Sequence, residues 1–350
     1  MALAKDRMRT RHIDSLQGWV SYARMRYRCH ACAQTYYPLD RELALHSGSR
    51  MSQQKEHQLA LLSVRLPYAE AKAVYEALTG LTVGRMTAHR VVQRLGGRAG
   101  EVNGSVPATA KPEAGGKTHI TADGVMIHLR GEGWKEAKVG AVYEVDDSRE
   151  TAQVRYTATV ESRDVFGEQL YELSGRPEAR DSAGMVFISD AAMWLGELHE
   201  LLFPLATRII DFWHVTEYVW AVANSFYPEG TARAQAWAAE HVTALRQGQA
   251  RRIQERLAQM RPRTKHQREV LDKARTYFEN HSHEMDYPRY EHLGYHIGSG
   301  IAEAACKHVI QSRFKRSGMR WSRPGAENLL RLRLAYLNHQ WDDWLAVMRN

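Results

Sequence analysis

Residues 119–129 read HITADGVMIHL, and this stretch decides the fold that we predict for the chain. Apolar and β-branched side chains dominate it, as they do in a buried strand. Asp123 nevertheless stands in its middle and is followed by Gly124. A carboxylate within an apolar strand is costly to bury unless it is paired or binds a metal ion. The stretch therefore predicts a buried strand that carries a functional acid.

Further strand patterns surround this one. We predict strands over 136–144, 152–161, 185–190 and 207–214, with helices near 163–174 and from Met193 onward. Three strands, a helix, a strand, a helix and a strand follow one another in the order of a ribonuclease H-like fold, a mixed sheet flanked by helices. The fold class that we predict is therefore α/β, with a ribonuclease H-like core.

Proline, glycine and helix-forming residues divide the rest of the chain. The predicted segments are a β-hairpin with a partial zinc ribbon over 1–48, a helix-turn-helix domain over 49–104, a linker over 105–117, the first part of the ribonuclease H-like core over 118–215, an all-helical insertion over 216–285, and the C-terminal helices of the core over 286–350.

Composition favours a nucleic-acid partner. The 350 residues carry a formal net charge of +8, and a basic protein is attracted to phosphates. Basic residues concentrate in two zones, 1–28 and 304–333, as in a surface that grips a duplex at more than one place. No apolar run is long enough for a membrane span and no apolar signal core follows Met1. We therefore expect a cytoplasmic, nucleoid-associated protein without a membrane partner.

The segment 69–95 has the pattern of a helix-turn-helix. One helix is predicted over 69–77, a turn contains Gly80, and a second helix runs over 85–95. The second helix carries Arg85, Arg90 and Arg94, which we expect to contact DNA in the major groove. Any pair of antiparallel helices shares this pattern, so a purely structural hairpin is the alternative.

Three cysteines, Cys29, Cys32 and Cys306, are too few for a disulfide scaffold. Cys29 and Cys32 have the spacing of one half of a zinc ribbon, in which two thiolates face one Zn²⁺ ion. No second cysteine pair lies upstream. Either His30 or a partner chain completes the site, or the pair is the remnant of a zinc knuckle and binds zinc weakly or not at all.

A second acid, Asp190, ends an apolar strand and is followed by Ala191 and Ala192. Two aspartates on neighbouring strands can share divalent cations, and carboxylate oxygens suit Mg²⁺ or Mn²⁺. Two such ions about 3.5–4 Å apart activate an attacking hydroxyl and stabilise the departing 3′ oxygen in DNA strand cleavage and transfer. The alternative for either aspartate alone is an ordinary turn or cap residue.

A third acid lies near the C-terminus, after Gly298-Ser299-Gly300. The glycines permit a tight turn, and Ser299 can cap the helix that follows. Glu303 falls in the first turn of that helix, where the helix dipole favours a carboxylate. Lys307 lies on the same side of the helix one turn later, so it can approach a phosphate near the metal ions.

The run GSGIAEAACKHVIQSRFKRSGMRW, residues 298–321, resembles the C-terminal signature of bacterial insertion-sequence transposases of the Kra type. These are DDE enzymes similar to the Mutator-like group. The resemblance implies that Asp123, Asp190 and Glu303 are the catalytic, metal-binding triad. The long stretch of this sequence between the second acid, Asp190, and the third, Glu303, fits the helical insertion of Mutator-like enzymes. Those enzymes often carry Cys-x-x-His after the second acid, whereas Asp211 to His214 keeps only the histidine, as a supporting residue.

The same resemblance implies partners and contacts. The partners are double-stranded DNA, as terminal inverted repeats and as target, and further copies of the chain in a homodimer or larger assembly. The expected DNA-contacting residues of the C-terminal segment are Lys307, Arg313, Lys315, Arg320 and Trp321. Trp321 either stacks on an unpaired base or packs the last helix against the sheet. Two other functions stay open, a defective or domesticated DNA-binding regulator and another ribonuclease H-like nuclease.

Overall fold

The computed structural model describes residues 3–43, 45, 49–84, 86–101, 116–175 and 184–347. The chain divides into two units. One unit joins Met1–Pro107 to Trp321–Asn350, and the other is Ala108–Arg320. Most of the predicted linker, together with Arg85, lies outside the described residues.

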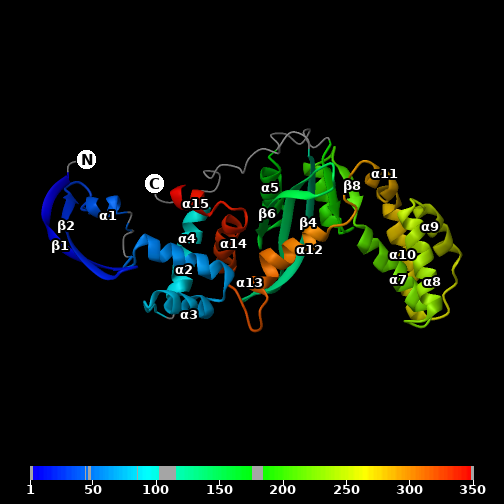
Figure 1. The fold of residues 1–350 in the computed structure, drawn as a ribbon, viewed down its shortest axis with the longest axis horizontal. Helices are drawn as coiled ribbons and strands as arrows, with labels where there is room; N and C mark the ends of the chain where they lie inside the picture. Colours follow the sequence, from blue (N-terminus) through cyan, green and yellow to red (C-terminus); the bar gives the residue numbers. More distant parts are fainter. Residues whose placement is uncertain are drawn as a thin grey trace. The chain divides into compact units, whose positions relative to one another are not determined.

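The helices and strands follow one another along the chain as Figure 1 shows. The strands are β1 (Leu3–Ser15), β2 (Gly18–Cys29), β3 (Thr35–Tyr36), β4 (Lys117–Leu129), β5 (Gly133–Val145), β6 (Thr151–Thr159), β7 (Val186–Ser189) and β8 (Thr207–Ile210). The helices up to the sheet's last strand are α1 (Pro38–Glu42), α2 (Gln53–Arg65), α3 (Tyr68–Thr79), α4 (Thr87–Glu101), α5 (Arg163–Ser174) and α6 (Met193–Leu202). The later helices are α7 (Phe212–Phe226), α8 (Ala232–Arg246), α9 (Ala250–Gln259), α10 (Lys265–His281), the 3₁₀ turn η2 (Ser282–Glu284), α11 (Tyr287–His292), α12 (Gly300–Ala305), the π-helical segment η3 (Cys306–Gln311), α13 (Ser312–Phe314), α14 (Arg323–Leu337) and α15 (Trp341–Val347).

A five-stranded sheet forms the centre of the unit Ala108–Arg320. Its strand order is β6-β5-β4-β7-β8. The strands β4, β5 and β6 pair antiparallel, whereas β7 lies parallel to β4 and β8 lies parallel to β7. This mixed sheet and its helices confirm the predicted α/β class.

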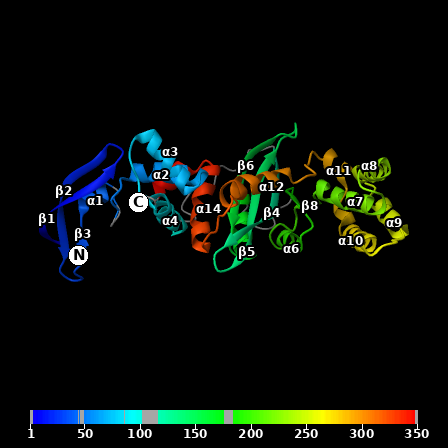
Figure 2. The same cartoon turned by 90° about the horizontal axis from the view of Figure 1, so that it is seen from below.

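The two faces of this sheet bury different side chains. Ile120 and Ala122 pack in a core with residues of α5 and α6. Because side chains alternate along a strand, Thr121 and Asp123 point to the opposite face. There α12 and η3 pack on β4 and β5, and α12 crosses the strands in the view of Figure 2. The alternation of β4 thus turns Asp123 toward the helix that carries Glu303.

The last predicted strand of the sheet is shorter than expected. We predicted a strand over 207–214, but β8 ends at Ile210 and α7 begins at Phe212. The Asp211 side chain accepts hydrogen bonds from the first free N–H groups of α7 and so caps the helix. The aromatic residues that suggested a strand are therefore the first turn of a helix.

A group of helices, α7 to α11, follows β8. The helices predicted over 216–285 are confirmed, and they enclose a core of their own that is continuous with the β7 and β8 side of the sheet. The helix predicted after Ser299 is present but is not uniform, since its middle is the π-helical segment η3.

The other unit contains a small sheet and a helical part. The sheet has the order β1-β2-β3, and its long hairpin joins β1 to β2. The helices α2, α4 and α14 pack together. Gly96 of α4 lies against the backbone of Asn328 in α14, where a Cβ atom would collide with it. We expected 286–350 to belong to the catalytic core, but this packing assigns Trp321–Asn350 to the amino-terminal unit.

The last two of the C-terminal helices, α14 and α15, are separate because the chain turns at His339, whose φ is 58°. None of the helices in the described ranges combines the length and the apolar character that crossing a bilayer requires.

Candidate active site

The register of the parallel strands brings the first two predicted acids together. Thr121 of β4 is level with Ile188 of β7. Two residues further along each strand, the same register makes Asp123 level with Asp190, and adjacent strands lie about 4.8 Å apart. The two carboxylates also interact electrostatically. Burial is the main cause that raises the pKa of Asp190, and the negative charge of Asp123 raises it further.

Both oxygens of Asp123 accept hydrogen bonds. The backbone N–H of Gly124 donates to Oδ1 over 2.6 Å, and the thiol of Cys306 donates to Oδ2 over 3.5 Å. Cys306 is buried, and burial, followed by the charge of Asp123, raises the pKa of its thiol. The thiol therefore stays protonated and acts as a donor. The sequence pattern does not reveal this contact, although Cys306 follows Glu303 by about one helical turn.

A third aspartate, Asp211, lies beside Asp190. Ser189 of β7 is level with Ile210 of β8, so one further residue on each strand aligns Asp190 with Asp211. Asp211 is only 2% exposed. Its position at the end of a buried strand was the signal that could have singled it out, since the same signal identified Asp190.

Four donors surround the Asp211 carboxylate. The N–H groups of Trp213 and His214 donate to Oδ1 over 2.6 and 3.1 Å. The N–H group of Ser299 donates to Oδ2 over 2.5 Å, and the Ser299 hydroxyl donates to the same oxygen. Burial acts to raise the pKa of Asp211, but the hydrogen bonds from His214 and Ser299 outweigh it and hold the pKa at about 2. Asp211 therefore fastens the Gly-Ser-Gly turn, and with it the start of α12, to the end of β8.

A cationic histidine lies beside these acids. His214 Nδ1 is 3.7 Å from Asp211 Oδ1. Interaction with the Asp211 carboxylate raises the pKa of His214 to about 9, against the opposing effect of burial. The ring is therefore protonated at neutral pH. Its positive charge acts to lower the pKa of Asp190, and its partly exposed edge can meet an anionic group.

The third predicted acid, Glu303, lies on α12, which packs on β4 and β5, and its side chain is turned to solvent. Its side chain is 69% exposed and pairs with Lys307 at 2.6 Å. Its negative charge contributes to the raised pKa of Cys306, the residue that contacts Asp123. Within the ranges that the structure describes, no set of three or more His, Cys, Asp or Glu side chains is arranged to hold a metal ion. The structure thus brings Asp123 and Asp190 together and leaves the Glu303 carboxylate outside the pair.

The donors at the sheet edge fit a hard divalent cation. Asp123 and Asp190 offer carboxylate oxygens at the same level of adjacent strands, and the negative charge of Asp123 helps to raise the pKa of Asp190. Mg²⁺ and Mn²⁺ prefer such ligands, and their positive charge relieves the repulsion between carboxylates.

The predicted zinc ligands are Cys29 and Cys32. Hydrogen bonds from Cys32 and Ala31 lower the pKa of the Cys29 thiol, which favours the thiolate that zinc requires. Cys29 is buried and Cys32 is exposed.

The predicted DNA-contacting residues of α4 have different surroundings. Arg90 is exposed, whereas Arg94 forms an ion pair with Glu56 at 2.5 Å. Both line a cavity of about 350 Å³ together with Trp19 of the β1–β2 hairpin and Arg50. This surface combines an exposed indole with three arginines.

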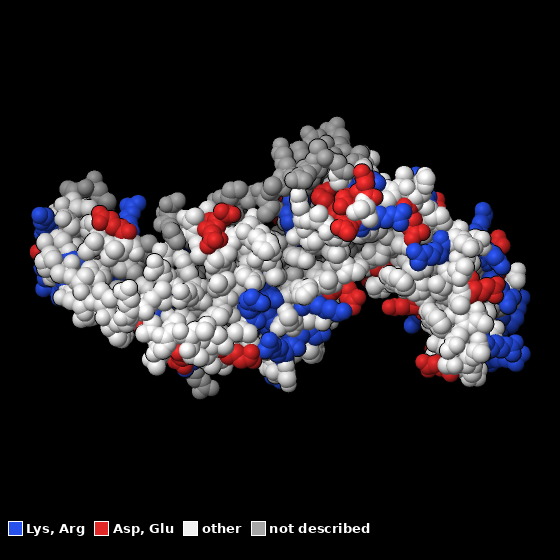
Figure 3. Space-filling view, in the orientation of Figure 1, with Lys and Arg blue, Asp and Glu red and all other residues white. Residues whose placement is uncertain are grey.

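The basic C-terminal segment is exposed only in part. Figure 3 shows Lys and Arg side chains gathered over α12, α13 and the chain that follows them. Lys307, Lys315 and Arg320 are exposed. Arg313 is fully buried, so its side chain does not reach the surface where we expected a DNA contact.

Trp321 is also buried. It is 8% exposed, and its ring meets the edge of Tyr68 with the ring centroids 6.3 Å apart. The packing alternative for Trp321 fits this position, although its partner is α3 rather than the sheet.

Comparison with known proteins places the chain in a family. The family model described as "Uncharacterised protein family (UPF0236)" matches residues 3–346. The chain is similar to the "UPF0236 protein in vanSb 3'region" of Streptococcus gallolyticus. The two are 25% identical over 343 residues, which cover 95% of this chain and 74% of that protein. Since the family model matches nearly the whole chain, the protein belongs to the UPF0236 family.

Proposed function

We propose that the protein is a DDE DNA transposase, which cleaves the ends of a mobile element and joins them to target DNA. The observation that carries the proposal is the alignment of Asp123 and Asp190 on adjacent parallel strands, beside the helix that bears Glu303. The strand order β6-β5-β4-β7-β8 supports it, because three antiparallel strands followed by two parallel ones are expected of a ribonuclease H-like core.

In this proposal the chain's own residues divide the work. Asp123 and Asp190 hold Mg²⁺ or Mn²⁺, and the exposed Glu303 side chain turns from Lys307 to complete the set. When bound there, such ions would supply activation of the attacking hydroxyl and stabilisation of the departing 3′ oxygen. His214, protonated at neutral pH, and Lys307 offer positive charge to the phosphate at the cut. Cys306 and Gly124 hold the Asp123 carboxylate in position.

The amino-terminal unit supplies DNA binding in the same proposal. The pair α3 and α4, joined through Gly80 in a left-handed conformation, supports a helix-turn-helix. Arg90 is its most exposed described arginine on α4. The partner is double-stranded DNA, and two ends are held by at least two copies of the chain.

The test measures cleavage of DNA that carries the ends of the proposed mobile element, taken from the sequence that flanks the gene. We expect cleavage in Mg²⁺ or Mn²⁺, none in chelator, and recovery when either metal is restored. Asp123→Asn, Asp190→Asn and Glu303→Gln should each slow cleavage about 1,000-fold, because a metal ligand supplies several kcal/mol of transition-state stabilisation. Asp164→Asn is the control, since that side chain is 82% exposed on α5.

The rival functions give other results. DNA binding without cleavage in either metal would indicate a regulator. Cleavage of any DNA or RNA/DNA hybrid, with no preference for the flanking ends and no strand joining, would indicate another ribonuclease H-like nuclease.

A further inference from the structure

A large cleft opens beside Asp190, between α7 and α10. Its volume is about 990 Å³, at the upper end of the range of roughly 300–1,000 Å³ that small-molecule sites occupy. The helix α7 contributes His214, Glu217, Tyr218 and Ala221 at helical spacing. The wall from α10 consists of Glu269, Asp272, Lys273, Thr276, Tyr277, Asn280 and His281. Figure 3 shows a notch between the α12 side of the sheet and the helical group, with acidic side chains on both of its rims.

One wall of the cleft contains an unsatisfied donor. Tyr277 is 8% exposed, and its hydroxyl has no hydrogen-bond partner among the described residues. Burial raises the pKa of Tyr277, so the hydroxyl stays neutral and can donate. Its ring stacks on Tyr218 with the centroids 3.9 Å apart. A buried hydroxyl without a partner is uncommon, and one that belongs to a residue lining a cleft points to a ligand that would satisfy it.

The charges of the cleft exclude a phosphate-rich occupant. Asp190, Glu217, Glu269 and Asp272 line it, together with the basic side chains of His214, Lys273 and His281. A DNA backbone or a nucleoside triphosphate would meet these carboxylates with a like charge. A carboxylate is instead a strong acceptor for N–H groups. The cleft thus suits an uncharged, planar group that has N–H donors and can also accept a hydrogen bond from a hydroxyl.

An unpaired nucleobase has this chemistry, and DNA held at Asp123 and Asp190 would lie at the mouth of the cleft. We propose that the cleft receives one unpaired, amino-bearing nucleobase of the DNA strand at the cut, as adenine, cytosine or guanine. The inference rests on the proposed function. Extrusion of a base next to the reacting phosphate exposes that phosphate to the metal site and lets pocket contacts select the base.

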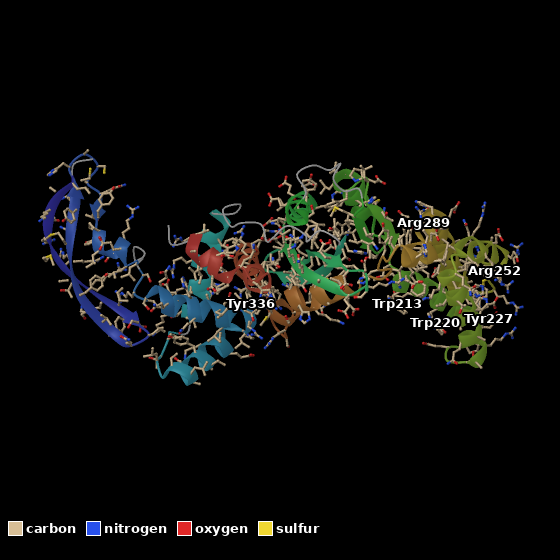
Figure 4. All side chains as sticks on the ribbon, turned by 45° about the horizontal axis from the view of Figure 1, so that its top comes forward. Trp213, Trp220, Tyr227, Arg252, Arg289 and Tyr336 are labelled. Atoms are coloured by element: carbon tan, nitrogen blue, oxygen red, sulfur yellow. The ribbon has the colours of Figure 1, made fainter. Side chains whose placement is uncertain are left out.

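Aromatic side chains beside the cleft extend the same surface. Trp213 and Trp220 are 61% and 39% exposed, and they follow one another along α7 toward Tyr227 in Figure 4. They lie about a quarter turn around the helix from the residues that line the cleft. Exposed indoles stack on bases without regard to sequence, so they offer a path for the neighbouring nucleotides.

The test compares two DNA duplexes of one sequence, both containing 2-aminopurine. In one the analogue is fully paired, and in the other it is unpaired in a short overhang. Binding is measured with the full chain in chelator, so that no strand is cut. We expect about tenfold tighter binding of the unpaired form and a change in 2-aminopurine emission. Thymine in place of the analogue should lose most of this preference, because thymine lacks an exocyclic amino group.

Two variants locate the effect in the cleft. Ala221→Trp fills the cleft from an exposed position, so it should abolish the preference and leave duplex affinity within twofold. Tyr277→Phe removes only the hydroxyl and should lower the preference about threefold. Tyr143→Phe is the matched control, since its buried hydroxyl also has no described partner but lies outside the cleft. Unchanged melting temperatures establish that the variants fold.

Each outcome has one consequence. Equal affinity for both duplexes, or a preference that Ala221→Trp leaves intact, overturns the inference and leaves the proposed function standing. Failure of the unaltered protein to bind either duplex overturns both.

Discussion

At the level of single residues, Asp211 joins the start of α7 to the turn before α12, the helix that carries the third proposed acid. One of its oxygens caps α7, and the other holds Ser299 before α12. Neither partner segment is close to the other in sequence. A single buried carboxylate thus connects β8, the helical group and the helix of Glu303.

The lowered pKa of Asp211 predicts how the free energy of unfolding depends on pH. Its folded value of about 2 is below the ordinary value of about 3.9. A lowered pKa contributes stability that is present above the unfolded value and is lost as the pH falls from about 4 to about 2. Asp211→Asn should therefore lower the free energy of unfolding by on the order of 2 kcal/mol at neutral pH. Unfolding in denaturant at a series of pH values measures this difference.

The difference between the unaltered protein and Asp211→Asn should shrink as the pH approaches 2. Asp164→Asn, an exposed acid of the same unit, should show no such difference. A difference in the free energy of unfolding between the unaltered protein and Asp211→Asn that stays constant across the acid range would mean that the Asp211 carboxylate does not stabilise the fold through its charge.

Single residues also mark where sequence reasoning reached its limit. Asp123 and Asp190 could be predicted because a carboxylate in an apolar strand is unusual. Cys306 and Asp211 could not be assigned their contacts, because their partners are 183 and 88 residues away. Arg313 carries a charge and would be expected at the surface, and only the packing shows that its side chain is buried.

At the scale of helices and strands, local pattern predicted most of the sheet. The strands β4, β5, β6 and β7 were recognisable from apolar and β-branched runs. The strand β1 was not, because its alternating Lys and Arg residues lack an apolar face. The first turn of α7 looked like a strand because aromatic residues favour strands, and the Asp211 cap overrides that preference.

The helix that carries Glu303 has a feature that periodicity did not predict. Its residues 306–311 are π-helical. Such turns occur often at functional sites, and here the turn contains Cys306, which contacts Asp123.

If α4 binds DNA, substitutions of its arginines should change how the affinity for DNA depends on salt concentration. Affinity for duplex DNA should fall with rising salt, and each phosphate contact contributes about 0.9 to the slope of the logarithmic plot. Arg90→Ala should lower that slope by about this amount, since Arg90 is exposed. Arg94→Ala should lower it less, because Arg94 also pairs with Glu56. Fluorescence anisotropy across a salt series measures both slopes.

Lys72→Ala is the control for α4. Lys72 pairs with Glu76 on the preceding helix, so its loss should leave the slope unchanged. An unchanged slope for Arg90→Ala would make α3 and α4 a structural hairpin.

At the scale of the whole molecule, the chain crosses between its two units twice. Residues Trp321–Asn350 return to the amino-terminal unit, where α14 packs on α4 at Gly96. Local patterns cannot reveal such a return, because the sequence of α14 is that of an ordinary amphipathic helix. The predicted domain order therefore captured the elements of 286–350 but not their partners.

In the proposed function, Asp123 and Asp190 share divalent cations that cut DNA, whereas the neighbouring Asp211 holds the fold. Replacement of each aspartate by cysteine separates these roles, since Mn²⁺ accepts a sulfur ligand better than the harder Mg²⁺ does. DNA cleavage is measured in each metal. We predict that Asp123→Cys and Asp190→Cys lose activity in Mg²⁺ and regain part of it in Mn²⁺, while Asp211→Cys regains none. Recovery of all three variants in Mn²⁺, or of none, would contradict the account.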